Sequence, residues 1–504
     1  MANTNKLNIL QIAAEAVPFS SVGGLSSVVT YLSKALHKQG HDVRVFMPKF
    51  GSIDEKKYPL EVVYKGLKVP TGYSKEDGKP IYLVCNIKQY KTTDGVIYYF
   101  LENMEYYEKR SNVYGYSDDH IRWALLSYGA IQYVSKHLDW KPDIIHSHDW
   151  HAGLVPNIVK TTYKKDPCFE NSACIHTIHN INFQGQSIDY SSEVNFDDGK
   201  SSIPRFFGER LKTLNYLKRG ILYSDLVNTV SEGYARQIIT QEYGAGLDKL
   251  LLELRSKLFG IINGIDTEKF DPANDPLLPY KFDKTSIKNR ALNKAKLQKE
   301  FGLEEDPNIM IFGSVGRLDH QKGIDLMLDV VEKFLKDFKA QFVLIGSGNE
   351  GYERSAQNLQ SKLKGMVGVH TYANFTLPKL VFGGADVILM PSRFEPCGIV
   401  QMEAMRYGAI PIVRSTGGLD DTVIDFNPAT LEGNGFKFRD FDGWSLYGQM
   451  VRAIETYRNK EVWERIQQNA MQADFSWDNV ALKYIDLYNK ASYFKKEKLL
   501  EKTL

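Results

Sequence analysis

Cysteine is scarce in this chain, and long apolar runs are absent. The four cysteines include no pair with C-x-x-C spacing, so a disulfide framework and a zinc ribbon are both excluded. No apolar run reaches the roughly 18 residues that a membrane span needs. Asn8, Gln11 and Glu15 interrupt the N-terminal apolar stretch and no cleavage pattern follows it, which indicates a core strand rather than a signal peptide. We therefore expect a soluble, cytoplasmic protein with reduced thiols.

An excess of charge of either sign is absent as well. Lys and Arg number 63 against 61 Asp and Glu, which leaves a net charge of +2. Nucleic-acid-binding domains usually concentrate basic charge, so this balance argues against nucleic acid as a partner. The 504 residues amount to roughly two to four average domains. A chain of this length can bury a large enough core without a structural metal.

The two halves of the chain repeat one pattern. In the first half, residues 7–47 read as strand, glycine turn, amphipathic helix and strand. The same order returns over residues 309–345, and two further strands are expected at 385–390 and 409–413. This pattern is typical of βαβ units with a parallel sheet. We therefore expect an α/β protein with two doubly wound, Rossmann-like domains.

We place the domain boundary near residue 258. A strand at 224–231 closes the first half, and residues 260–272 are expected to open the second with a strand and a loop. This gives an N-terminal domain at 1–257 and a C-terminal domain at 258–477. The basic, amphipathic tail at 491–504 is interpreted as a surface helix or a frayed end.

Ligands of such sheets bind at the carboxyl ends of the strands, so the loops there hold the candidate residues. Gly23 and Gly24 open a helix, where bare N–H groups suit a phosphate, although a plain turn is the simpler interpretation. Arg317 and Lys322 follow a strand, and two fixed cations are what a departing diphosphate requires. Solvated surface charges remain the alternative for this pair.

Carboxylates and histidines supply the remaining candidates. Glu395 stands at the entry of a helix, where it can accept a hydrogen bond from a sugar hydroxyl or face positive charge on a sugar ring. In the alternative interpretation, Glu395 caps its helix and Glu403 is a buried structural carboxylate. Asp149 in HSHDWH is interpreted as a polar substrate contact. His179 can face the same cleft, although a structural role is the more common one for a lone histidine. Strand alternation disfavours a metal cluster in that motif, and the D-x-D at 440–442 lies in a polar turn. No metal site is predicted.

Together these loops resemble the bacterial glycogen synthase and plant starch synthase family. The motifs run in the order VGGL, HSHDWHAGLVP, HTIHN, GRLDHQKG, PSRFEPCG and STGGLDDTV, within a likeness from residue 7 to about 490. The resemblance implies a two-domain GT-B fold with its active cleft between the domains. It also implies retaining transfer of glucose from ADP-glucose to the non-reducing end of an α-1,4-glucan, without a cofactor or a catalytic metal. The family's C-terminal helix crosses back, so 478–504 is expected to pack on the first domain.

The resemblance also assigns roles to individual residues. The catalytic set that it implies is Glu395, Asp149, His179, Arg317 and Lys322. Donor binding is assigned to Arg317, Lys322 and Glu395 together with Gly23, Gly24, Cys397, Gly398, Thr416, Gly417 and Gly418. Acceptor binding is assigned to Tyr114, Asp149 and Asn180.

One loop departs from the family pattern. The family usually reads K-x-G-G-L-x-D, whereas this chain has Ser21 and Ser27 at the charged positions. A charged hydrogen bond is worth about 1.5–3 kcal/mol, so the loss costs roughly 10- to 100-fold unless another cation, such as Lys218 or Arg219, substitutes. Two alternatives therefore stay open: an enzyme of the same fold with UDP-glucose or another acceptor, and a non-catalytic glucan-binding paralogue.

Overall fold

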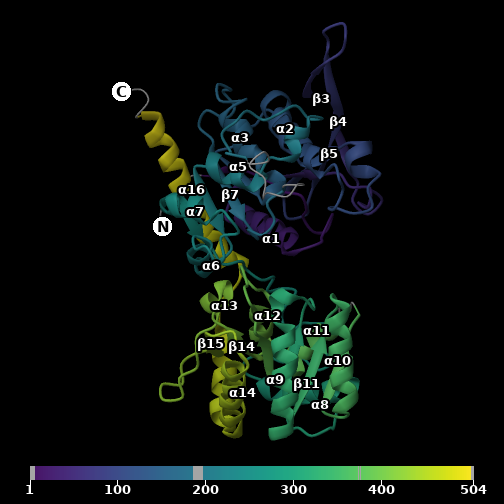
Figure 1. Ribbon diagram of the computed structural model, residues 1–504, viewed down its shortest axis with the longest axis vertical. Coiled ribbons are helices and arrows are strands. Elements are labelled where there is room, and N and C mark those ends of the chain that lie inside the picture. Colours follow the sequence, from purple (N-terminus) through teal and green to yellow (C-terminus); the bar gives the residue numbers. More distant parts are fainter. Residues whose placement is uncertain (1–5, 186–196, 373, 375, 501–504) are drawn as a thin grey trace. The chain divides into compact units, whose positions relative to one another are not determined.

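The computed structural model describes residues 6–185, 197–372, 374 and 376–500, and Figure 1 shows its ribbon. The chain divides into two compact units, which are described separately. The first takes in residues 1–230, 235–261 and 477–504, and the second takes in 231–234 and 262–476. Within the described part of the chain, no helix combines the length and the apolar character needed to cross a membrane.

The first unit is built on a nine-stranded sheet with the order β3-β4-β5-β2-β1-β6-β7-β8-β9. From β5 to β9 all neighbouring strands are parallel, whereas β3 and β4 form a long antiparallel hairpin beside β5 (Figure 1). Chain order reverses between β1 and β6, so this is the switch point where ligands bind in such sheets. The strands are β1 (Asn8–Ile12), β2 (Asp42–Pro48), β3 (Glu61–Ser74), β4 (Pro80–Lys91), β5 (Ile97–Glu102), β6 (Ile144–His148), β7 (Ala173–Ile178), β8 (Leu226–Thr229) and β9 (Leu258–Gly260).

Helices cover both faces of the first sheet because the strands alternate their side chains. Ile9 of β1 packs in the core formed with α1 and α16, whereas the next residue, Leu10, packs in the core on the α2 and α3 side. The helices of this unit are α1 (Gly24–Lys38), α2 (Asp119–His137), α3 (Leu154–Lys160), α4 (Glu209–Lys212), α5 (Tyr216–Tyr223), α7 (Asp248–Glu253) and α16 (Trp477–Leu500), and α6 (Glu232–Gln237) has residues in both units.

The C-terminal helix α16 is an integral part of the first unit. Tyr484 and Tyr488 are fully buried. The hydroxyl of Tyr488 lies 2.9 Å from Nδ1 of His146, and Asn228 donates to the Tyr484 hydroxyl at 3.1 Å. Apolar burial and these two polar contacts therefore hold the helix on this unit. The tail predicted at 491–504 continues α16 as far as Leu500, so a helix rather than a frayed end describes residues 491–500.

The second unit is a six-stranded parallel sheet in the order β12-β11-β10-β13-β14-β15. This is the strand order of a Rossmann fold, with its switch point between β10 and β13. Its strands are β10 (Met310–Val315), β11 (Ala340–Ile345), β12 (Val367–His370), β13 (Val387–Met390), β14 (Ile410–Arg414) and β15 (Phe436–Phe438). Its helices are α8 (Arg290–Glu300), α9 (Ile324–Asp337), α10 (Glu350–Lys362), α11 (Leu377–Gly384), α12 (Val400–Arg406), α13 (Gly417–Thr422), α14 (Gly443–Arg458) and α15 (Lys460–Gln472).

The strand expected to open the second domain belongs to the first sheet. β9 pairs in parallel with β8, and the N–H of Ile261 donates to the carbonyl of Thr229 at 2.9 Å. Ile261 is buried in the core beneath α16. The change of unit therefore falls at residues 261–262 rather than near 258, because strand pairing extends past the point that composition suggested.

Candidate active site

Two loops meet at the switch point of the second unit, one after β10 and one after β13. The N–H of Arg393 donates to the carbonyl of Gln321 at 2.8 Å. Gly323, which precedes α9, has a φ of 66°, and a Cβ there would lie 2.2 Å from the carbonyl oxygen of Pro391. Only glycine fits this approach, so the QKG sequence is what lets the first loop dock against the second.

Lys322 and Glu395 form an ion pair across these two loops. Nζ of Lys322 lies 2.5 Å from Oε2 of Glu395, and the same oxygen accepts from the hydroxyl of Ser392 at 3.2 Å. Glu395 is buried, with 5% of its surface exposed, so the pair is a charge-assisted hydrogen bond away from bulk water. The carboxylate therefore has a fixed position and a cation beside it. The interpretation of Glu395 as a helix cap is wrong, because α12 has no side-chain cap.

Arg317 lies in the same loop but points into solvent. Its side chain is 72% exposed and pairs with Asp319 at 3.0 Å. Asp319 also accepts from the backbone N–H of Lys322 at 3.1 Å. The loop thus holds Lys322 against a carboxylate and exposes Arg317 on the surface, where it can bind an anion.

The STGG sequence packs against the FEPCG loop through its glycines. The N–H of Gly418 donates to the carbonyl of Glu395 at 3.1 Å, and a Cβ at this position would lie 2.1 Å from the carbonyl oxygen of Cys397. Thr416 precedes α13, and Gly417 has a φ of 47°. Burial raises the pKa of the Cys397 thiol to about 12, so it is neutral at pH 7. Gly398, with a φ of 71°, completes the turn.

Asp149 stands at the end of β6 in a strained conformation. Its φ is 53° and its ψ is −177°, a region that side chains rarely adopt and that often marks functional positions. Its Oδ1 accepts from the N–H of His179 at 2.7 Å, and the N–H of Asn180 is a second donor to this carboxyl. Burial raises the pKa of Asp149 to about 7, against the effect of these two bonds. The sequence-predicted residues Asp149, His179 and Asn180 thus lie together.

Histidine side chains around Asp149 form a buried chain of hydrogen bonds. Nδ1 of His148 lies 3.1 Å from Nε2 of His179, and Nε2 of His148 lies 2.8 Å from Oε1 of Gln11. Burial lowers the pKa of His179 to about 3 and that of His148 well below its usual value, so both rings are neutral at pH 7. No cluster of three metal-binding side chains is found in the described ranges. The imidazoles are therefore arranged for hydrogen bonding.

Glu15 is the residue of this site that the sequence did not reveal. It lies in the loop after β1, across the switch point from Asp149, which follows β6, and its charge acts on that of Asp149. Its Oε1 accepts from the hydroxyl of the predicted acceptor residue Tyr114 at 2.7 Å. The signal was present, because Glu15 follows a buried strand and opens the EAVPF sequence that is similar to the family, but no role was assigned to it.

The VGGL sequence forms the turn before α1. Gly23 precedes the helix without a side-chain cap, and Gly24 is its first residue. Both glycines are exposed. The hydroxyls of Ser21 and Ser26 lie 2.8 Å apart, and Ser26 also donates to the carbonyl of Gly23 at 2.9 Å. Ser21, which replaces the family lysine, therefore closes the turn with a neutral hydrogen bond.

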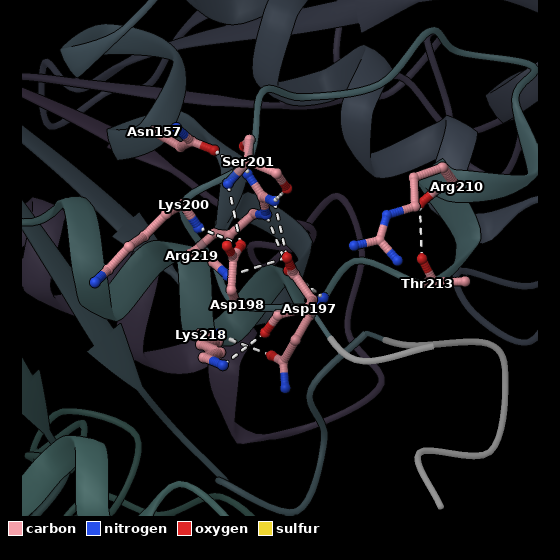
Figure 2. Close-up of polar contacts among 11 residues, drawn as sticks. Asn157, Asp197, Asp198, Lys200, Ser201, Arg210, Thr213, Lys218 and Arg219 are labelled. Atoms are coloured by element: carbon pink, nitrogen blue, oxygen red, sulfur yellow. Dashed lines mark hydrogen bonds and ion pairs between the residues drawn. The ribbon is translucent and has the colours of Figure 1, made fainter. Parts of the chain in front are cut away.

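Neither candidate substitute for that lysine is free to serve. Figure 2 shows Arg219 enclosed by Asp197, Ser201 and Asn157. Arg219 and Asp197 are fully buried and make two bonds, at 2.9 and 3.0 Å. Nζ of Lys218 donates to the carbonyl of Asp197 at 2.6 Å (Figure 2). Both cations therefore belong to a structural cluster.

Glu403 and Asp442, two further residues considered from the sequence, have structural rather than catalytic roles. Glu403 is partly buried in α12, and burial raises its pKa to about 7 against the opposing charges of Lys379 and Lys269. Asp442 of the D-x-D sequence caps α14 by accepting from the N–H groups of Trp444 and Ser445.

The geometry defines a class of protein. Two doubly wound units carry polar side chains at their switch points, and one of them places two cations, Lys322 and Arg317, in the loop after β10, where they can face a diphosphate. This is a nucleotide-sugar glycosyltransferase of the GT-B type, and the predicted α/β fold class is confirmed. The structure of the catalytic domain of starch synthase IV from Arabidopsis thaliana, bound to ADP and acarbose, is similar with a TM-score of 0.81, 31% identity, and coverage of 97% of this chain and 100% of that one. Sucrose-phosphate synthase from Thermosynechococcus elongatus shares the fold, with a TM-score of 0.59, 18% identity, and coverage of 96% of this chain and 99% of that one.

Sequence comparisons narrow the class to one family. Residues 8–253 match the starch synthase catalytic domain, and residues 293–461 match the glycosyl transferases group 1 domain. A glycogen synthase from Thermotoga maritima is 40% identical over 96% of this chain and 99% of its own length. One from Desulforamulus reducens is 38% identical over 96% of this chain and 98% of its own length. The chain belongs to the glycogen synthase family, and the predicted family and enzyme class are confirmed.

Proposed function

We propose that the chain transfers glucose from ADP-glucose to the non-reducing end of an α-1,4-glucan, with retention at the anomeric carbon. The observation that carries this proposal is the Lys322–Glu395 pair at the switch point of the second unit. The bond from C1 to the diphosphate breaks and the bond from C1 to the acceptor O4 forms on the same face. The acceptor hydroxyl proton passes to the departing diphosphate, so no further reactant is needed.

In this proposal the second unit stabilises the charges that develop on the donor. Lys322 and the exposed Arg317 stabilise the negative charge that grows on the leaving diphosphate. Glu395 accepts a hydroxyl of the donor glucose and faces the positive charge of the oxocarbenium-like ring. The turns of Gly398 and of Thr416–Gly417 supply backbone N–H groups toward the nucleotide, and Gly418 holds this turn against the FEPCG loop.

In this proposal the first unit binds the hydroxyl groups of the transferred glucose and of the acceptor. Asp149 and His179 contact the transferred glucose, and Tyr114 and Asn180 contact the acceptor. The neutral state of His179 suits this role, since a neutral imidazole both donates and accepts a hydrogen bond. Gly23 and Gly24 offer backbone N–H groups to the diphosphate.

Nucleotide release tests the proposal. The purified chain is incubated with ADP-glucose and, in parallel, with UDP-glucose, each with and without glycogen. Glycogen-dependent release of ADP is the expected result. Release only from UDP-glucose overturns the donor assignment and assigns the Ser21 replacement to donor choice. A folded protein that binds glycogen but releases neither nucleotide is a non-catalytic paralogue. The cytoplasmic location stays a prediction.

A further inference from the structure

Glu15 is a buried carboxylate that holds the turn before α1. Only 2% of its surface is exposed. Its Oε2 accepts from the N–H of Val22 at 2.5 Å, and the N–H of Gly23 is a further donor to it. These amides stand just before the bare N-terminus of α1, where an anion is favoured. An internal anion therefore already occupies donors next to the place where a diphosphate would bind.

The negative charge of Glu15 has no cationic partner among the residues that the structure describes. Its side-chain contact besides the turn is the hydroxyl of Tyr114, from the loop before α2. Ser21, beside the amide that Glu15 binds, is neutral and bonds to Ser26. The family pattern to which the sequence is similar has a lysine at position 21, where this chain has the neutral serine. The replacement thus leaves a buried negative charge uncompensated beside an anion site.

We propose that Glu15 is a positioning residue that sets donor affinity: it shapes the 21–24 turn, and its uncompensated charge opposes the diphosphate that the turn receives. The inference rests on the proposed function, because it places the donor diphosphate at this turn. Removing the charge while keeping the shape strengthens donor binding, and so does supplying a cation at position 21.

Most groups that face Glu15 do not titrate near neutral pH, so protonation of Glu15 should change the affinity for the donor as the pH falls. Burial raises the pKa of Glu15 above its usual value, so it takes up a proton at a higher pH than an exposed glutamate does. Burial also keeps the phenol of Tyr114 and the imidazole of His151, which packs on it, neutral. Asp149, with a pKa of about 7, also titrates in this range. Asp119, a further carboxylate near Tyr114, is paired with Arg122 at 2.5 Å.

The test measures ADP-glucose binding by calorimetry without glucan, at pH 5.5 and pH 8. A diphosphate diester keeps its charge across this range, so the ligand does not titrate. For Glu15→Gln we expect a Kd about three- to tenfold lower than that of the wild type at pH 8, and a smaller difference at pH 5.5. The pH dependence that remains in this variant belongs to Asp149. An unchanged or higher Kd at pH 8 in the folded variant overturns the proposal.

Two further variants extend the test, and the first of them keeps it decisive if Glu15→Gln does not fold. Tyr114→Phe removes a hydrogen bond to the charged carboxylate, so the midpoint of the pH dependence moves upward. Ser21→Lys lowers the Kd in the wild type and lowers it less in the Glu15→Gln background, because both changes remove one repulsion. Full additivity, or an unmoved midpoint, contradicts the proposal.

A matched control removes a charge elsewhere in the same unit. Glu61 is exposed on β3 at the far edge of the sheet, and Glu61→Gln is expected to leave the Kd unchanged. Binding without turnover separates this inference from the proposed function. A wild type that binds ADP-glucose but releases no ADP contradicts the proposed function and leaves the affinity comparison valid.

Discussion

The two units treat charge differently at the same point of their sheets. At the β10–β13 switch point, Glu395 is paired with Lys322 at 2.5 Å, and Arg317 stands exposed nearby. At the β1–β6 switch point, Glu15 and Asp149 are buried with hydroxyl and N–H donors, and the described residues supply no cation to either. One fold thus supports one site whose carboxylate is compensated by a cation and another whose carboxyl groups have only neutral hydrogen-bond donors. The predictions below test this contrast.

The largest effect is expected at the charged site. Glu395→Ala should lower kcat with ADP-glucose and glycogen by at least about 100-fold, because a group that stabilises the transition state is lost. Glu432→Ala removes an exposed carboxylate of the same unit and should leave kcat unaltered. Near-normal turnover of the Glu395 variant would show that the active-site assignment is wrong.

Removal of the partner cation comes next. Lys322→Met should lower kcat by about 30- to 100-fold, since the leaving diphosphate loses a cation and Glu395 is left buried and unpaired. Lys333→Met, in the exposed pair with Asp329, is the matched control. Equal kcat values for the two lysine variants would show that Lys322 does not stabilise the leaving diphosphate.

At the site of the first unit, replacing the buried Asp149 should stabilise the folded protein. The pKa of Asp149 rises to about 7 in the folded protein, so the folded state holds a proton that the unfolded chain loses above its ordinary value of 3.8. Stability from this group is present below that value and is lost as the pH rises through 7. Asp149→Asn should therefore raise the free energy of unfolding at pH 8 by on the order of 2 kcal/mol.

Urea unfolding at pH 8 and pH 5 checks this sign, and the gain should shrink at the lower pH. Asparagine has the same shape as aspartate, so the backbone strain at position 149 is the same in both proteins and does not obscure the result. The exposed Asp139→Asn is the control. A gain that is equal at both pH values would mean that the burial of Asp149 is not what costs stability.

The smallest effect is expected from Lys218. Because its Nζ is bound to the carbonyl of Asp197, Lys218→Met should change the Kd for ADP-glucose by less than about twofold, within the scatter usual for a removed structural contact. A tenfold weaker affinity, measured by the same calorimetry, would instead make this lysine the substitute for the family cation and would erase the contrast between the two sites.

Much of the candidate site follows from local sequence. Arg317, Lys322 and Glu395 were predicted because each stands in a loop directly after an apolar strand, and the sheet brings such loops together. Glu15 was missed even though it occupies the same kind of position. Its contacts come from Tyr114, about a hundred residues away, and from the turn amides, and no local pattern encodes them.

The sequence by itself determined the two βαβ patterns, the family and the loops that carry the chemistry, because strand periodicity and glycine turns are local properties. Only the tertiary structure decided which charges are compensated. Arg219 is enclosed by Asp197, β9 pairs with β8, and Glu15 stays without a cation because burial and pairing join residues that are distant in the chain. The electrostatic free energy of a group depends on those neighbours, so charge balance at the two sites emerges only on folding.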